Sequence, residues 1–162
     1  MKKISILLTV LLVCLFGIFA IGSGESSTDN QGDGNANGGN NGNLGMYSVV
    51  IESSRLAEDY EGKPVIIVTY KYTNVSNDTP TAFCVAFDDN AYQNGVGLNE
   101  AYFLADNVNY NSDNQTKEIK KGASLSVEIA YSLNDTTTDV EIEVEQLFSL
   151  DSKKVTKTFK LK

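Results

Sequence analysis

The most regular alternation of apolar and polar positions lies in the C-terminal two-thirds of the chain. In the run 64–74 (PVIIVTYKYTN), β-branched and aromatic residues fill nearly every position, and turn-forming segments bound it on both sides. Both faces of this run are apolar over 65–68, whereas only one face is apolar towards 74. The pattern predicts a central β-strand whose first half is buried on both sides.

Further runs of period two follow one another along the rest of the chain. They cover residues 47–56, 81–88, 123–133, 140–145 and 155–161. The spacing at 98–105 is helical, which leaves one or two helical turns open there. Strands that recur every 8–12 residues or so, without long helices, predict an all-β, antiparallel β-sandwich over residues 46–162.

The N-terminus carries a different pattern. Lys2 and Lys3 precede an apolar run over 4–22. A charged end followed by such a run predicts a hydrophobic helix that enters the bilayer, so residues 1–22 are expected to be a signal peptide or a membrane anchor. The run just reaches the ~20 residues that a membrane-spanning helix needs.

Three fates of this segment stay open. Ala20 and Gly22 give the small-x-small pattern of a cleavage site, and an uncleaved segment would remain as an anchor. Cys14 follows Leu11 as in a lipidation signal, but Val13 stands where a small residue is expected. All three fates predict an extracytoplasmic protein, membrane-anchored or secreted, with the membrane as a partner through this segment.

Residues 23–45 (SGESSTDNQGDGNANGGNNGNLG) are rich in Gly and Asn and have almost nothing to bury. Such a composition cannot offset the entropy of ordering, so a disordered tether is expected here. The predicted domains are therefore a hydrophobic segment (1–22), a tether (23–45) and a β-sandwich (46–162).

Composition excludes several classes of function. The formal net charge is −8, and an acidic domain repels phosphate backbones, so a nucleic-acid partner is excluded. The chain has no His, which rules out Ser-His-Asp and Cys-His catalysis. We expect no enzyme activity and no cofactor. The weakest alternative is an enzyme that works through two carboxylates facing each other across a pocket.

Few residues are candidates for chemistry. Cys84 lies within a predicted strand, where a buried and inert thiol is expected. Asp88, Asp89 and Asn90 form an acidic cluster at the end of that strand, where they could contribute to a calcium site or cap a turn; the sequence leaves the metal open. Tyr70, Tyr72 and Tyr131 are in phase with core residues and are expected to be buried.

Tyr92, Tyr102 and Tyr110 lie near irregular segments and are the better candidates for exposed binding residues. Side by side, they would give a flat aromatic platform for a sugar ring or a partner protein. Together with Asp88 and Asp89 they place a candidate ligand site in 88–114, the longest stretch of broken periodicity. No catalytic, cofactor or metal residue is assigned.

Four stretches carry a resemblance to a known family: DYEGKPVIIVTYKYTNVS, AYQNGVGL, a Lys-Lys-Gly turn before ASLSVEIAYSLND, and VEIEVEQLF. Over 47–161 the chain resembles a Gram-positive family of extracytoplasmic domains of unknown function. That family is similar to the immunoglobulin-like fold of a mycobacterial secreted immunoprotective antigen. The resemblance implies an immunoglobulin-like sandwich behind a lipoprotein signal or membrane anchor, and transfers no site residue.

These observations predict a non-enzymatic recognition or adhesion domain on the bacterial cell surface, with an unknown envelope protein or saccharide as partner. The alternative is a carbohydrate-binding module for the cell wall, which requires the exposed tyrosines to lie together.

Overall fold

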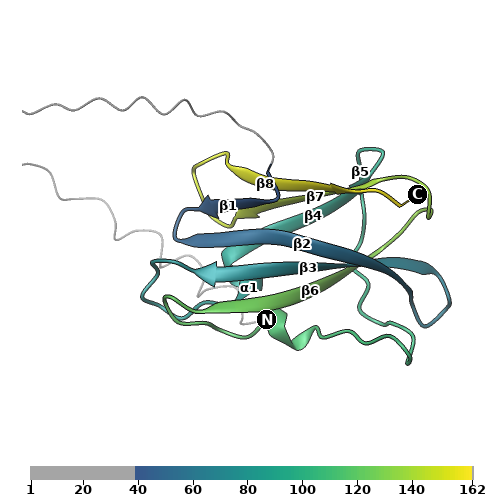
Figure 1. Cartoon of the computed structure of the whole chain (residues 1–162), viewed down its shortest axis with the longest axis horizontal. Helices are drawn as coiled ribbons and strands as arrows, with labels where there is room; N and C mark the ends of the chain where they lie inside the picture. The colour runs from purple at the N-terminus through teal and green to yellow at the C-terminus, as the bar shows by residue number, and fades with distance from the viewer. Residues whose placement is uncertain (1–38, 162) are drawn as a thin grey trace, which may run out of the picture. The chain divides into compact units, whose positions relative to one another are not determined.

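The structure is a computed structural model that describes residues 39–161, and these form two four-stranded antiparallel sheets (Figure 1). The first sheet has the order β1-β2-β3-β6, with β1 Asn41–Leu44, β2 Tyr47–Glu58, β3 Pro64–Asn74 and β6 Ser124–Ser132. The second has the order β5-β4-β7-β8, with β5 Val96–Gly97, β4 Phe87–Gln93, β7 Val140–Gln146 and β8 Lys154–Phe159. A one-turn helix α1, Phe83–Ala86, and a 3-10 turn η1, Asp113–Gln115, lie between strands. The predicted all-β sandwich is confirmed.

The main core lies between the two sheets and is rich in aromatic rings. Tyr72 packs edge-on against Phe83 and Phe87, with ring centroids 6.0 and 5.5 Å apart. Tyr47 meets Phe87 in the same manner at 5.8 Å. Edge-to-face pairs of this kind add stability beyond the area that they bury. The tyrosines expected in the core, Tyr70, Tyr72 and Tyr131, are all buried.

Strand β3 is the centre of the fold, as its pattern predicts. Val65, Ile66, Ile67 and Val68 are fully buried, whereas Lys71 is exposed. Alternate members of the apolar run serve two cores: Ile66 and Val68 face the second sheet, and Val65 and Ile67 face a second cluster on the outer side. Burial on both sides therefore explains why the first half of this strand has no polar position.

Strand β7, with one face in the core and one in water, also agrees with the prediction. In β7 the buried residues Val140, Ile142 and Val144 alternate with more exposed glutamates. One of these, Glu143, forms an ion pair with Lys154 at 2.7 Å. Such a face in water suits an antiparallel strand at a sandwich surface.

Strand β1 lies inside the stretch 23–45, for which composition predicts no folded structure. Its residues pair with 47–50 of β2 across a tight turn, and Leu44 is buried in the main core. One apolar side chain and a short hairpin thus order the end of a Gly/Asn-rich stretch. The predicted hydrophobic segment 1–22 and residues 23–38 lie outside the described residues.

The expected strand over 81–88 is wrong in its first half. Phe83 to Ala86 form helix α1, and the strand begins only at Phe87. Phe83, Ala86 and Phe87 are buried while Val85 is 60% exposed, so the apolar spacing is three and four rather than two. A single helical turn and a short strand both place Phe83 and Phe87 inward, which is why the alternation misleads.

The helix also changes the expected environment of Cys84. It was expected to be buried in a strand, but on α1 its side chain is exposed. We expect a maleimide to label Cys84 in the folded chain nearly as fast as in denaturant, because no packing shields the thiol. Peptide mass spectrometry separates Cys84 from Cys14, and Cys84→Ser is the control. Labelling of Cys84 only after unfolding would contradict the helical assignment.

The segment 98–105, where helical spacing left a helix open, contains no helix and runs as an extended loop. Within residues 39–161, no helix combines the length and the apolar character needed to span a bilayer.

Candidate binding surface

Three large aromatic side chains stand exposed together at one end of the sandwich. Tyr60 lies in the turn between β2 and β3 and is 68% exposed, while Tyr102 and Phe103 lie in the loop after β5 and are each 73% exposed. With Leu104 and Asp106 they line a shallow hollow of about 540 Å³. We call Tyr60, Tyr102 and Phe103 the aromatic surface.

Backbone hydrogen bonds join the two segments that carry these rings. The Tyr60 amide donates to the Phe103 carbonyl oxygen at 3.2 Å, and the Ala105 amide donates to the Glu58 carbonyl oxygen at 3.1 Å. Leu104 therefore forms an isolated antiparallel bridge with Asp59, just beyond the end of β2. This pairing holds the two backbones beside each other, so the rings of Tyr60 and Phe103 lie close together before any ligand arrives.

The turn itself is built by Asp59. Its carboxylate oxygen Oδ1 accepts the amides of Glu61 and Lys63, each at 2.8 Å, and Gly62 supplies the positive φ of +78° that the turn requires. Tyr60 is the one turn residue between these anchors with a large apolar side chain, so the local structure directs it outward.

The loop stays on the sheet because it covers the second core. Ala101 is buried against Val65, Ile67 and Ala130 on the outer face of the first sheet, and its amide donates to the Ala130 carbonyl oxygen at 2.8 Å. Val108 packs partly on the same cluster. The outer apolar half of β3 thus decides where the loop, and with it the aromatic surface, lies.

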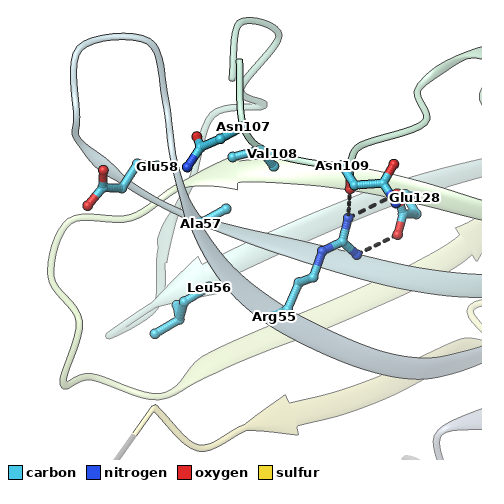
Figure 2. A pocket seen from close by; sticks show the side chains of 8 residues that line it. All are labelled: Arg55, Leu56, Ala57, Glu58, Asn107, Val108, Asn109 and Glu128. Atoms are coloured by element: carbon cyan, nitrogen blue, oxygen red, sulfur yellow. Dashed lines mark hydrogen bonds and ion pairs between the residues drawn. The ribbon is translucent and has the colours of Figure 1, made fainter. Parts of the chain in front are cut away.

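An ion pair fastens the other part of this loop beside a groove of about 600 Å³ (Figure 2). The Arg55 guanidinium from β2 makes two contacts with the Glu128 carboxylate from β6, one of them at 3.2 Å, and also donates to the Asn109 carbonyl oxygen. The Asn111 amide donates to the same carboxylate. Hydrogen bonds from Arg55 lower the pKa of Glu128, so the pair stays ionised at neutral pH. The charged side chains at this groove are already paired with each other, which favours a structural role for them over ligand binding.

The aromatic surface is surrounded by acidic side chains. The Tyr60 hydroxyl donates to the Glu61 carboxylate at 3.1 Å, and a hydrogen bond to Glu100 raises the pKa of Tyr102. The other carboxylates at this end are Glu58, Asp59 and Asp106. Lys63 supplies a cation, but it is paired with Glu61. The surface therefore combines exposed rings with an excess of negative charge.

The structure separates the three tyrosines named from sequence. Tyr102 belongs to the aromatic surface, whereas Tyr92 is half-buried at a different hollow, beside Asp139 and Glu141. Tyr110 is also half-buried, packs on the second core and accepts a hydrogen bond from Gln115. The three do not form one platform.

The neighbouring residues Asp88 and Asp89 also lie in different environments. Asp88 is exposed and accepts a hydrogen bond from Asn90 at 3.1 Å, whereas Asp89 points between the sheets, where the Tyr131 hydroxyl donates to it. Tyr131 also meets the Tyr70 hydroxyl at 3.0 Å. Burial raises the pKa of Asp89 to about 6. Within residues 39–161, no three acidic or thiol side chains come close enough together to hold a metal ion.

Sequence reasoning missed two of the three aromatic residues. Tyr60 falls in the turn-forming segment before 64–74 and Phe103 in the stretch 98–105, and neither pattern predicts an exposed ring. The available signal was an aromatic residue among turn formers in Asp59-Tyr60-Glu61-Gly62, because a turn gives a large ring no core to enter. Their proximity, which depends on pairing between segments about forty positions apart, had no local signal.

Comparison with known proteins agrees with this fold. A crystal structure of a Bacillus subtilis protein, described as a putative lipoprotein, superposes with a TM-score of 0.57 at 14% identity. The match covers 75% of this chain and 38% of that one, so the likeness shows a shared fold over part of a longer protein. A search of curated proteins gave no match. Residues 23–146, more than half of the sequence, match the family described as "Domain of unknown function (DUF5067)". This chain is therefore a member of the DUF5067 family.

Proposed function

We propose that this chain is a non-enzymatic recognition domain, tethered outside the cytoplasmic membrane, that binds a partner protein through the aromatic surface. The observation that carries the proposal is the exposure of Tyr60, Tyr102 and Phe103 side by side on two segments that backbone hydrogen bonds hold together. The apolar run 4–22, and a structural neighbour described as a lipoprotein, support the extracytoplasmic location.

Exposed rings of this size are costly to keep in water and typical of contact surfaces. Tyr and Phe are enriched at the centres of protein interfaces, where truncation to alanine has its largest effects. The rings of Tyr60 and Phe103 have centroids 6.2 Å apart and meet nearly perpendicularly, at 86°. They stabilise each other edge to face and leave further ring faces free for a partner.

The charge around the rings indicates what kind of segment would bind. Carboxylates of Glu58, Glu61, Glu100 and Asp106 are all exposed at this end. A Lys or Arg side chain placed over an aromatic ring gains a cation–π contact, and nearby carboxylates strengthen the attraction. We therefore expect a basic protein segment as the partner, with affinity that falls as salt rises.

The carbohydrate alternative is less well supported by this geometry. Stacking on a sugar ring uses a flat aromatic face, and perpendicular rings do not combine into one. Tyr92 and Tyr110 are also half-buried elsewhere. Binding of a saccharide therefore becomes an outcome of the test.

We expect Tyr60→Ala and Phe103→Ala each to weaken binding of a Lys/Arg-rich peptide about ten-fold, as loss of a central interface ring does. The purified full chain in detergent micelles would be titrated with this peptide, with its Glu-substituted version and with N-acetylglucosamine oligomers. Phe148→Ala removes a ring that is even more exposed, at 97%, on a different turn, and is the matched control.

In an NMR titration, amide shifts confined to residues 58–61 and 102–106 would support the proposal. Equal loss of affinity in Phe148→Ala, or binding of the oligomers in preference to the basic peptide, would contradict it.

A further inference from the structure

A second group of exposed apolar side chains lies at the opposite end of the sandwich. In the turn between β7 and β8, Phe148 is 97% exposed and Leu150 is 103% exposed. Val85 on α1 and Met46 and Val75, beyond the adjoining ends of β2 and β3, are between 43% and 60% exposed. We call these five residues the apolar end.

Backbone contacts show that these segments are neighbours. The Leu147 amide donates to the Ala86 carbonyl oxygen at 3.0 Å, which joins the β7–β8 turn to α1. The Val75 amide donates to the Met46 carbonyl oxygen, also at 3.0 Å. Figure 1 shows the end of β1 and the β7–β8 turn together at the left, with the β2–β3 turn at the right.

The conformation of Phe148 is unusual for its residue type. Its φ of +58° lies in the left-handed region, which a bulky side chain rarely adopts and which Gly or Asn would adopt at lower cost. The ring gains no packing within the described chain in return, since it is almost completely exposed. A strained backbone that displays an apolar ring is a reason to look for a contact outside the chain.

We propose that the apolar end inserts its β7–β8 tip into the headgroup region of the bilayer to which the chain is tethered. This inference rests on the proposed membrane tethering, and not on the identity of the partner. Phe and Leu are side chains that interfacial segments bury at the boundary between headgroups and acyl chains.

The position of the tether makes the contact possible. The described chain begins at Gly39, and β1, about 13 Å long, leads from there to the turn beside Gln146. Residues 23–38 between the predicted anchor and this point can span at most about 55 Å. The apolar end is therefore within reach of the membrane surface.

Local charge at the β7–β8 turn is less negative than at the end that carries the aromatic surface. The full chain has a formal charge of −8, and the opposite end is acidic. The β7–β8 turn instead carries Asp151 and Lys153, and Lys153 has no ion pair among residues 39–161. Lys154, the first residue of β8, is paired with Glu143. Contact through the apolar end would also direct the aromatic surface away from the membrane, towards a partner.

Because the chain has no Trp, one introduced indole reports on one position. The full chain with Phe148→Trp would be reconstituted in vesicles of phosphatidylcholine and phosphatidylglycerol, and Tyr102→Trp in the same vesicles is the matched control. We expect the indole at 148 to emit at shorter wavelength and to be quenched several-fold more by brominated lipid than the indole at 102.

The outcomes separate the two proposals. Vesicles that float with the chain while both indoles are equally open to acrylamide would overturn bilayer insertion and leave the tethering intact. A chain that does not float would overturn the tethering, and insertion with it. A blue shift at 148 that grows with protein concentration, without quenching by brominated lipid, would identify a second copy as the occupant and overturn insertion.

Discussion

Val68→Asp and Ile129→Asp are expected to abolish folding. Val68 is completely buried, Ile129 is 3% exposed, and the two residues pair across β3 and β6 in the core between the sheets. A carboxylate at either position would find no partner, and a buried unpaired charge costs about as much as the 5–15 kcal/mol that holds a small domain together. Circular dichroism and the yield of soluble protein measure the loss.

The matched control is Glu143→Gln on β7. Glu143 is half-buried, faces water and pairs with Lys154, so its replacement is expected to cost less than about 1 kcal/mol. If Glu143→Gln unfolded the protein as Val68→Asp does, the assignment of inward and outward faces would be wrong.

Asp89→Asn is expected to make the domain more stable at pH 8 and to leave it nearly unchanged at pH 4. The folded state raises the pKa of Asp89 to about 6 from an ordinary 3.8, mainly through burial. Stability from the protonated group is therefore complete below pH 3.8 and is lost as the pH rises through 6. The shift corresponds to at most about 3 kcal/mol.

The amide of Asn keeps an acceptor for the Tyr131 hydroxyl without a charge to desolvate. Denaturant unfolding of both proteins at several pH values gives the difference, in which the other titrating groups cancel. Asp88→Asn, at the exposed neighbour, is the control and should follow the wild type. A difference between Asp89→Asn and wild type that does not vary with pH would contradict the account.

The sequence predicts those parts of the fold that depend only on which faces of a single strand are buried. The runs of β3, β6 and β7 alternate or are continuously apolar, and both patterns follow from how many faces are buried. Even the doubly buried half of β3 was predicted, because Val65 to Val68 leave no polar face. What the outer face packs against, the loop carrying Ala101, could not be read from the strand.

The candidate site was harder to predict, because its residues meet through contacts between distant segments. Tyr60 and Phe103 come together only because Leu104 forms a bridge with Asp59, just beyond the end of β2. Asp89 does carry a local signal: it is in phase with the buried residues Phe87 and Ala91 on β4, so alternation along that strand directs its carboxylate inward.

The most direct test of the recognition role is photo-crosslinking on intact cells. A benzophenone amino acid would replace Tyr102 in the full chain, and Tyr92, half-buried at another hollow, gives the control position. The account predicts a protein adduct from position 102 that is absent from position 92, disappears with Phe103→Ala, and maps to a basic segment of the partner. Equal adducts from both positions, or none from position 102, would contradict it.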